Sequence, residues 1–247
     1  MTMGRSRIFG PLAGAWFLLT LTAIGFATRM ALIEAPTDAL QGNVFRIFFY
    51  HVPQAMLSLV WPYINLAASV GFLYWRRRDP LRALTADAVA IASAEVTLVY
   101  ASICLATGML WGRVEWGIWW TWDGRLTSML LLWLLYVSYL MLRKFSATGQ
   151  TQTLAAVLSI FAAIDVPIVY KSIDWWRTQH PSRVFMSSDP DSHVDKAYYP
   201  AWEANIVAWA MWGLLLIAIR YALERRRQER EQDAALKAIE DSLEFTR

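Results

Sequence analysis

The chain has 247 residues, of which 57% are hydrophobic and only 17% are charged. An ordinary soluble domain carries about 25% charged residues, so this composition excludes a typical soluble protein. The net charge of +3 is small, and the basic residues cluster at the ends of apolar blocks, which excludes the broad basic surface of a nucleic-acid-binding protein.

Six apolar blocks follow one another along the chain, and each has about the length needed to cross a bilayer, roughly 20 residues. They span about residues 11–28 with an extension toward 33, 52–75, 83–110, 126–142, 154–173 and 201–219. The first block resembles the apolar part of a signal peptide, but it is longer and no cleavage site is obvious, so we expect a retained helix. Because helices satisfy every backbone polar group in lipid, the sequence predicts an all-α, polytopic integral membrane protein with six transmembrane helices.

The charged residues between the blocks predict the orientation in the membrane. The N-terminus, the loops after the second and fourth blocks, and the C-terminal tail are rich in arginine and lysine. The other loops mix arginine with acidic residues. By the positive-inside rule, both termini are cytoplasmic and the remaining loops face the outside, which is the periplasm in a Gram-negative cell.

A charged tail at residues 223–247 follows the predicted six-helix domain of residues 1–222. Its charges are mixed at helical spacing, which predicts a solvated helix whose polybasic start contacts anionic lipid. Docking of a cytoplasmic subunit on this helix is the alternative interpretation.

The outer loop between the third and fourth blocks has an unusual sequence, WGRVEWGIWWTWDGRLTS, at residues 111–128. Five tryptophans fall within twelve residues and are followed by Asp123. Indole rings suit the boundary between lipid and water, so a dense interfacial belt is one interpretation. Five indoles also give more flat apolar surface than anchoring requires, and a planar ligand is the other interpretation.

Only three histidines occur, His51, His180 and His193, and all three are predicted on the outer side. His51 lies at the start of the second block and His180 follows the fifth, so imidazoles from two helices can approach one metal ion from opposite faces. A single interfacial histidine is often only an amphipathic side chain, but imidazole is also the common axial ligand of haem iron. The lone Cys104 excludes an internal disulfide, a Cys-x-x-Cys-His haem attachment and a cysteine-rich zinc site.

A haem would suit this combination of residues. Indoles can cover the flat, apolar macrocycle, and arginine guanidinium groups can pair with its two propionates. The arginines available in the outer loops are Arg113, Arg125, Arg177 and Arg183.

Three segments resemble motifs of one known family. They are FFYHVPQA around His51, WGIWWTWDGRLTS at residues 116–128 and DVPIVYKSIDWWRTQH ending at His180. They are similar, in the same order, to the motifs of the haem exporter protein C (CcmC) family of bacterial cytochrome c maturation, whose tryptophan-rich "WWD" signature is shared by haem-handling membrane proteins. The resemblance covers about residues 8–222.

The resemblance implies a site for haem b with His51 and His180 as axial ligands of the iron. The haem-contacting signature falls on Trp116, Trp119, Trp120, Trp122 and Asp123, with Arg125 directly behind it. His193 matches no motif of the family.

The resemblance also implies a function and partners. A member of the family binds haem at the periplasmic face of the bacterial inner membrane and transfers it to the haem chaperone CcmE during c-type cytochrome biogenesis. It does so in a complex with the ABC transporter subunits CcmA and CcmB and the small membrane protein CcmD. The chain has no P-loop and no evident nucleophile–base pair, so we expect no catalytic residue of its own and assign ATP hydrolysis to a partner.

Two acidic residues lie well inside the apolar blocks, Glu95 near the middle of the third and Asp165 two residues before Pro167 in the fifth. Such residues are costly in a membrane and often mark function, so a transporter subunit with a substrate or proton pathway is the alternative function. Pairing within the bundle or with a partner subunit is the structural interpretation, with Lys171 as the available basic partner.

Overall fold

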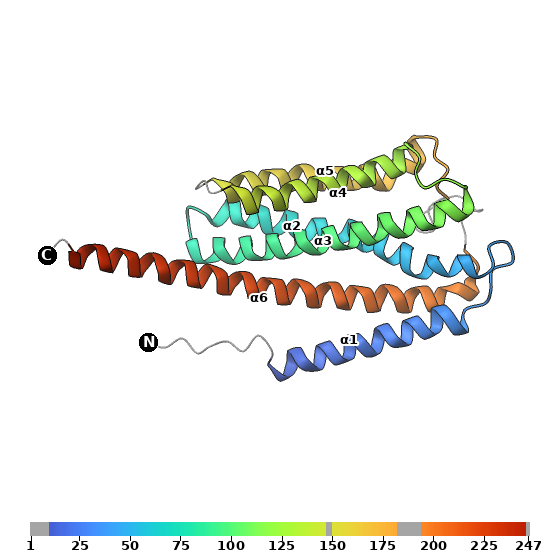
Figure 1. Cartoon of the computed structure of the whole chain (residues 1–247), viewed down its shortest axis with the longest axis horizontal. Coiled ribbons are helices and arrows are strands. Elements are labelled where there is room, and N and C mark those ends of the chain that lie inside the picture. The colour runs from blue at the N-terminus through green and yellow to red at the C-terminus, as the bar shows by residue number, and fades with distance from the viewer. Residues whose placement is uncertain (1–9, 147–149, 182–193, 246–247) are drawn as a thin grey trace.

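The computed structural model describes residues 10–146, 150–181 and 194–245, and no β-strand forms in these ranges. Six long helices follow one another in the described chain (Figure 1). They are α1 (Pro11–Arg29), α2 (Phe48–Trp75), α3 (Pro80–Glu115), α4 (Gly124–Phe145), α5 (Thr151–Trp175) and α6 (Tyr199–Phe245). A turn of π-helix (Met30–Glu34) extends α1, and short 3-10 helices (Asn43–Ile47 and Lys196–Tyr198) precede α2 and α6. Each of the six is long and apolar enough to span a membrane, which confirms the predicted all-α membrane fold.

The helix boundaries follow local capping chemistry. The side chain of Asp79 accepts a hydrogen bond from the backbone N–H of Arg82, and Pro80 fills the first position of α3, where its missing N–H costs nothing. The helix continues past the predicted end of the third apolar block at residue 110 and reaches Glu115. It stops there because Gly117, with φ of 75°, turns the chain into the left-handed region.

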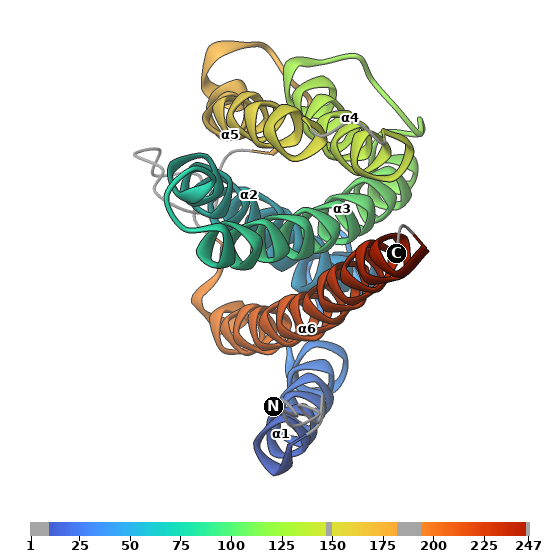
Figure 2. The ribbon, with the colours of Figure 1, turned by 90° about the vertical axis from the view of Figure 1, so that its left-hand side faces the viewer.

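The helices are arranged in layers, seen end-on in Figure 2. α2 and α3 form the central, most closely packed pair, with α4 and α5 on one side and α6 on the other. α1 packs on α6 at the edge of the bundle. Because successive long helices alternate in direction, the start of α2, the end of α3, the start of α4 and the end of α5 meet at one end, which we call the histidine end.

Buried polar side chains tie the middle of the bundle together. Asn65 of α2 is fully buried, donates to the backbone carbonyl of Ala90 at 2.7 Å and accepts from the hydroxyl of Ser159 at 2.5 Å. Tyr136 of α4 donates to the same Asn65 oxygen at 3.3 Å. One side chain therefore links α2 to α3, α4 and α5, and such interhelical bonds fix the register of helices that lie in lipid.

A network of ion pairs ties the opposite end of the bundle. The guanidinium of Arg143 binds both carboxylate oxygens of Asp87 at 2.8 Å, and its side chain is only 5% exposed. Gln152 of α5 donates to Asp87 at 3.0 Å, and Glu224 of α6 lies 4.0 Å from Arg143. This network joins α3, α4, α5 and α6 where the predicted membrane domain meets the tail.

The two intramembrane acidic residues have different surroundings. Glu95 accepts two hydrogen bonds from Arg220 of α6, which is a pairing inside the bundle. The predicted pairing of Asp165 with Lys171 is wrong, because Lys171 instead binds Asp174 one turn further on, at 3.3 Å. Both carboxylate oxygens of Asp165 are buried and have no hydrogen-bond partner in the described chain.

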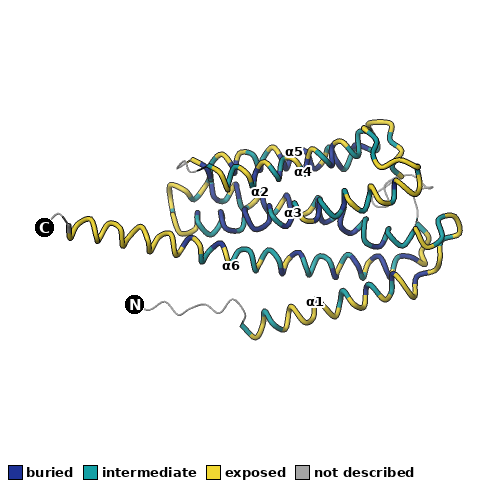
Figure 3. The backbone as a smooth tube through the Cα atoms, viewed as in Figure 1, coloured by how far each residue is buried: buried dark blue, intermediate teal, exposed yellow. Residues whose placement is uncertain are grey.

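The predicted tail is helical and continuous with the sixth span, since α6 runs unbroken from Tyr199 to Phe245. Figure 3 shows that its final turns extend beyond the rest of the bundle, and residues 229–244 are exposed. α1 begins and α6 ends at the same end of the bundle, opposite the histidine end (Figure 1).

Candidate functional site

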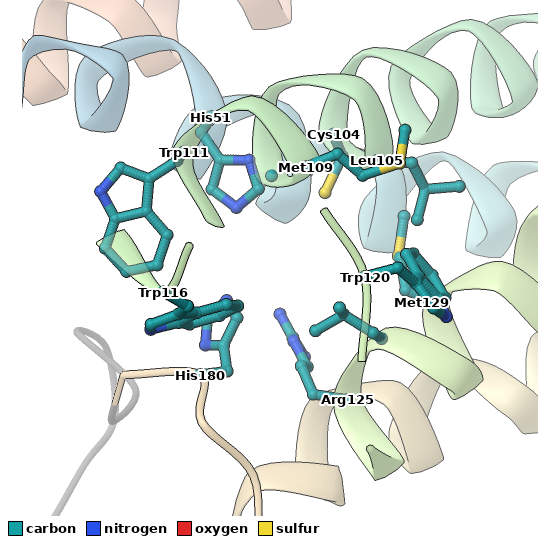
Figure 4. A pocket seen from close by; sticks show the side chains of 12 residues that line it. His51, Cys104, Leu105, Met109, Trp111, Trp116, Trp120, Arg125, Met129 and His180 are labelled. Atoms are coloured by element: carbon teal, nitrogen blue, oxygen red, sulfur yellow. The ribbon is translucent and has the colours of Figure 1, made fainter. Parts of the chain in front are cut away.

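Two histidines lie close together at the histidine end. His51 is in the first turn of α2, and His180 lies five residues beyond the last residue of α5. Their ring centroids are 6.5 Å apart, and the ring planes are tilted by 41°. Figure 4 shows the two rings on opposite sides of a common cavity, with the guanidinium of Arg125 pointing into it.

The hydrogen bonds of His51 fix which nitrogen carries its proton. Its Nδ1 lies 2.9 Å from the hydroxyl oxygen of Thr107 on α3. Thr107 has one hydroxyl hydrogen and directs it to the backbone carbonyl of Ile103 at 2.6 Å, as helical threonines commonly do. The hydroxyl oxygen must therefore accept from His51, so Nδ1 is protonated and Nε2 keeps a free lone pair.

A glycine lets His51 approach α3 this closely. A Cβ atom placed on Gly108 would lie 3.1 Å from Cε1 of His51, closer than nearly all real contacts of this kind. The imidazole thus occupies the space beside the backbone of Gly108, where it is held by the hydroxyl of Thr107.

His180 has the same tautomer by a different route. Its Nδ1 lies 2.9 Å from the carbonyl oxygen of Pro181, and a carbonyl only accepts, so Nδ1 carries the proton. Its backbone N–H is held by the hydroxyl of Thr178 at 3.0 Å. Burial and the nearby positive charge of Arg125 lower the pKa of His180 to about 4. The ring is therefore neutral at pH 7, with a lone pair on Nε2.

Cavities lie on both sides of the histidine pair. One is lined by residues of α3 and α4 and by the loop between them. The other is lined by Phe45, Phe48 and neighbouring apolar residues before and within α2. His51, Trp111 and His180 line both cavities. A flat group held between the two imidazoles would therefore find largely apolar space on either side.

The tryptophans of the signature divide into two sets. Trp116 and Trp120 line the first cavity. Trp116 sits over Gly112, where a Cβ would lie 3.1 Å from its ring, and makes an edge-to-face contact with Trp111 at 5.1 Å. Trp119 and Trp122 do not line the cavity and are 56% and 77% exposed. Of the four predicted haem-contacting tryptophans, two thus face the cavity.

Asp123 caps a helix at the edge of the site. One carboxylate oxygen accepts from the backbone N–H groups of Arg125 and Leu126 at 2.9 and 3.0 Å, and the other accepts from the hydroxyl of Thr121 at 2.8 Å. Asp123 does not line the cavity, but it fixes the start of α4 and so the place of Arg125. Arg125 lines the cavity and donates to the backbone carbonyl of Val169 on α5 at 2.5 Å.

The other predicted candidates lie apart from the cavity or outside the described residues. Arg113 donates to the carbonyl of Gly117 within the turn that ends α3. Arg177 is exposed and does not line either cavity. Arg183 and His193 fall in the part of the chain that the structure does not describe.

Two residues of the site escaped the sequence analysis, Thr107 and Gly108. The spacing of two glycines could have indicated Gly108. Gly108 and Gly112 are one helical turn apart, so they share a face of α3 on which other side chains can approach closely. Nothing in the sequence connects Thr107 with His51, which is 56 residues away.

Comparison with known proteins gives consistent results. A family model described as "Heme exporter protein C" matches residues 4–235. Heme exporter protein C of Bradyrhizobium diazoefficiens is 39% identical over 197 residues, covering 78% of this chain and 72% of the relative. The protein of the same name from Haemophilus influenzae is 32% identical over 225 residues, covering 90% and 86%. A putative cytochrome c biosynthesis ccmC-like mitochondrial protein of Arabidopsis thaliana is 36% identical over 180 residues, covering 72% and 64%.

Proposed function

The chain belongs to the heme exporter protein C family, and we propose that it holds haem b between His51 and His180 and hands it to a haem chaperone. Membership of this family gives it a role in haem transport for cytochrome c maturation, and its six apolar helices make it a multi-pass membrane protein.

The observation that carries the proposal is the geometry of the two imidazoles. An iron bound to both Nε2 atoms by bonds of about 2 Å would place the ring centroids about 6 Å apart, and the centroids are 6.5 Å apart. Both Nδ1 atoms are occupied by hydrogen bonds, so both Nε2 atoms are available.

The ligand count favours a haem over a bare metal ion. In the described chain, no group of three or more histidine, cysteine, aspartate or glutamate residues is placed to hold a metal. A metal between two histidines must therefore bring its other ligands with it, as haem iron does with four porphyrin nitrogens. The only cysteine, Cys104, cannot form the two thioether bonds of a c-type haem, which favours non-covalent haem b.

The surroundings of the two histidines suit the porphyrin ring and the propionates of a haem. The two cavities give apolar space on both sides of the histidine pair, and Trp116 and Trp120 offer flat indole surface. Arg125 supplies a guanidinium for a propionate, a pairing in which planar, two-pronged hydrogen bonding is strong. The indole N–H of Trp120 is buried without a partner in the described chain and is a further donor.

The two axial ligands differ in how firmly they are held, and this difference suggests the order of release. His51 is part of a transmembrane helix and is fixed by Thr107 and by contact with Gly108. His180 lies in a connecting segment and is held by Thr178 and Pro181, both within two residues of it. Docking of the chaperone on that segment would therefore disturb His180 before His51, so His180 would be the ligand that yields the haem and His51 the one that retains it until transfer.

We propose that the histidine end faces the periplasm at the bacterial inner membrane, because basic loops gather at the opposite end. The acceptor is the chaperone CcmE, and CcmA, CcmB and CcmD complete the complex. Trp119 and Trp122 are exposed beside the cavity tryptophans, and Trp122 contacts Trp120 at 5.6 Å, so the indole surface continues from the cavity to the exterior. This continuous surface suits a haem that is passed along it.

The alternative function, a pathway through Glu95 and Asp165, has less support. Both carboxylate oxygens of Glu95 accept hydrogen bonds from Arg220, and such a held carboxylate is poorly suited to relay a proton or a substrate. Asp165 alone does not form a pathway.

The proposal is tested by the absorption spectrum of the full chain purified with haem. The parent protein should show a low-spin, bis-histidine spectrum, and His51→Ala and His180→Ala should each abolish it. His193→Ala is the matched control and should keep the parent spectrum. A bis-histidine spectrum that persists in both His51→Ala and His180→Ala would overturn the assignment.

A further inference from the structure

A second hollow lies at the end of the bundle remote from the histidines. α3 packs against both α4 and α6, while α4 and α6 do not pack along each other (Figure 2). The hollow between them, of about 1020 Å³ and open outward, is lined by residues of all three helices. We call it the basic groove.

The lining of the basic groove is amphipathic. Its apolar part consists of Ile91, Leu140 and Leu223. Five cationic side chains and two acidic ones surround this part; they are Arg143, Lys144, Arg220, Arg227, Arg230, Glu95 and Glu224. A cavity that combines apolar walls with excess positive charge suits an anion that carries hydrocarbon.

The two acidic residues are already neutralised. Glu95 is bound by Arg220, which also lines the groove. Glu224 is 4% exposed and accepts from Arg227 at 2.6 Å. Arg143, in turn, is held by Asp87. Because the other charged residues of the lining are paired, Lys144 and Arg230 supply the excess positive charge at the opening of the groove.

Lys144 and Arg230 have no acidic partner among the described residues. The ammonium of Lys144 lies 5.5 Å from the centre of the Phe145 ring, and the guanidinium of Arg230 donates to the backbone carbonyl of Arg226 at 3.3 Å. Both side chains belong to exposed residues, one on α4 and one on α6, so they flank the opening from both sides.

We propose that the basic groove binds an anionic phospholipid, with its phosphodiester between Lys144 and Arg230 and its acyl chains along Ile91, Leu140 and Leu223. Charge complementarity selects the anionic headgroup. The apolar wall favours a lipid over free phosphate, which would leave that wall exposed to water. The occupant would bridge α4 and α6, which are otherwise joined here by the contact of Arg143 with Glu224.

The test measures lipid binding to the full chain in detergent by native mass spectrometry, with added phosphatidylglycerol, phosphatidylethanolamine or inorganic phosphate. The parent chain should retain phosphatidylglycerol in preference to phosphatidylethanolamine, and inorganic phosphate should not displace it. The double variant Lys144→Gln/Arg230→Gln should bind phosphatidylglycerol about thirtyfold more weakly, because each basic side chain at a membrane surface contributes roughly a factor of five.

The matched control is Arg77→Gln/Lys237→Gln, which removes two exposed cations from the same end of the bundle outside the groove. It should bind phosphatidylglycerol like the parent. Equal weakening in both double variants, unchanged binding in Lys144→Gln/Arg230→Gln, or equal retention of phosphatidylethanolamine would each overturn the proposal. Displacement by inorganic phosphate would overturn the lipid assignment as well. Haem binding at the other end is unaffected by either outcome.

Discussion

The two ends of the helix bundle use polar residues in opposite ways. At the end that holds Asp87 and Arg143, charged groups are buried and satisfy one another. At the histidine end, each imidazole has one nitrogen in a hydrogen bond and the other without a partner among the described residues, beside a cavity. Polar side chains that all bind one another hold helices together. A side chain that keeps one nitrogen without a hydrogen bond can instead bind a ligand. The contrast predicts that substitutions at the first end change stability and substitutions at the second change haem binding.

The largest effect is expected from Asp87→Ala, which leaves the guanidinium of Arg143 buried without its bidentate partner. Removing one member of a buried ion pair typically costs about 3–5 kcal/mol. Thermal unfolding of the purified variant in detergent should therefore begin at a clearly lower temperature than in the parent. The double variant Asp87→Leu/Arg143→Met should recover most of the loss, because no uncompensated charge remains. An unchanged unfolding temperature in Asp87→Ala would show that this network does not hold the bundle together.

At the histidine end, Thr107→Val removes the acceptor for the Nδ1–H of His51 while keeping the shape of the side chain. Loss of such a supporting hydrogen bond typically lowers metal affinity about 10- to 100-fold, and we expect haem affinity, measured by absorbance titration, to fall in this range. The unfolding temperature should change little. Thr107→Ser keeps the hydroxyl and should bind haem like the parent. Equal haem affinity in Thr107→Val and Thr107→Ser would contradict the tautomer argument.

A smaller effect is expected from Gly108→Ala, whose new Cβ would lie 3.1 Å from Cε1 of His51. The ring must shift by a few tenths of an ångström, so we expect haem affinity to fall several-fold and the low-spin spectrum to weaken. Gly71→Ala is the matched control in a helix interior, since its Cβ would meet only Ala86 at an ordinary 3.7 Å. The control should leave haem binding unchanged and raise stability by about 0.5–1 kcal/mol. Similar haem affinity in both variants would remove Gly108 from the site.

The smallest effect concerns pH. Iron and a proton compete for the same lone pair of His180, whose pKa burial and Arg125 lower to about 4. Since the ring stays neutral down to that value, haem binding should be constant from pH 8 to about 5 and should weaken as the pH approaches 4. With an unperturbed histidine, the haem affinity would begin to fall below about pH 6.5 instead. Measurement of the haem dissociation constant at a series of pH values distinguishes the two, and a fall in affinity that begins near pH 6.5 would contradict the proposed environment of His180.

Sequence reasoning located the helices well because the signal is local. A block of about 20 apolar residues predicts a span whatever lies around it, and all six spans occur in the structure. The ends were less accurate: α3 passes residue 110 to reach Glu115, because its end depends on the conformation of Gly117. The backbone conformation of a single residue cannot be read from the hydropathy of the sequence.

The pair of histidines at the site was predictable from the sequence, and the residues that hold them in place were less so. His51 and His180 stood out because histidine is rare in this chain, and the structure brings them together. The partners of Glu95 and His51, which are Arg220 and Thr107, were not predictable, because they depend on the rotation and register of helices far apart in sequence. The exposure of Trp119 and Trp122 also could not be predicted, since the side chains of an irregular loop do not alternate between buried and exposed with a fixed period.

The small number of donors between α2 and the segment after α5 has a consequence for selectivity. Among the described residues, a zinc ion that entered this gap would find two histidine nitrogens where it prefers four protein ligands, so these residues would hold a hydrated cation weakly. The same shortage is no obstacle to a cargo that arrives with a ring of nitrogens already around its metal. The small number of protein ligands, rather than the shape of the site, would then keep common divalent ions from blocking it.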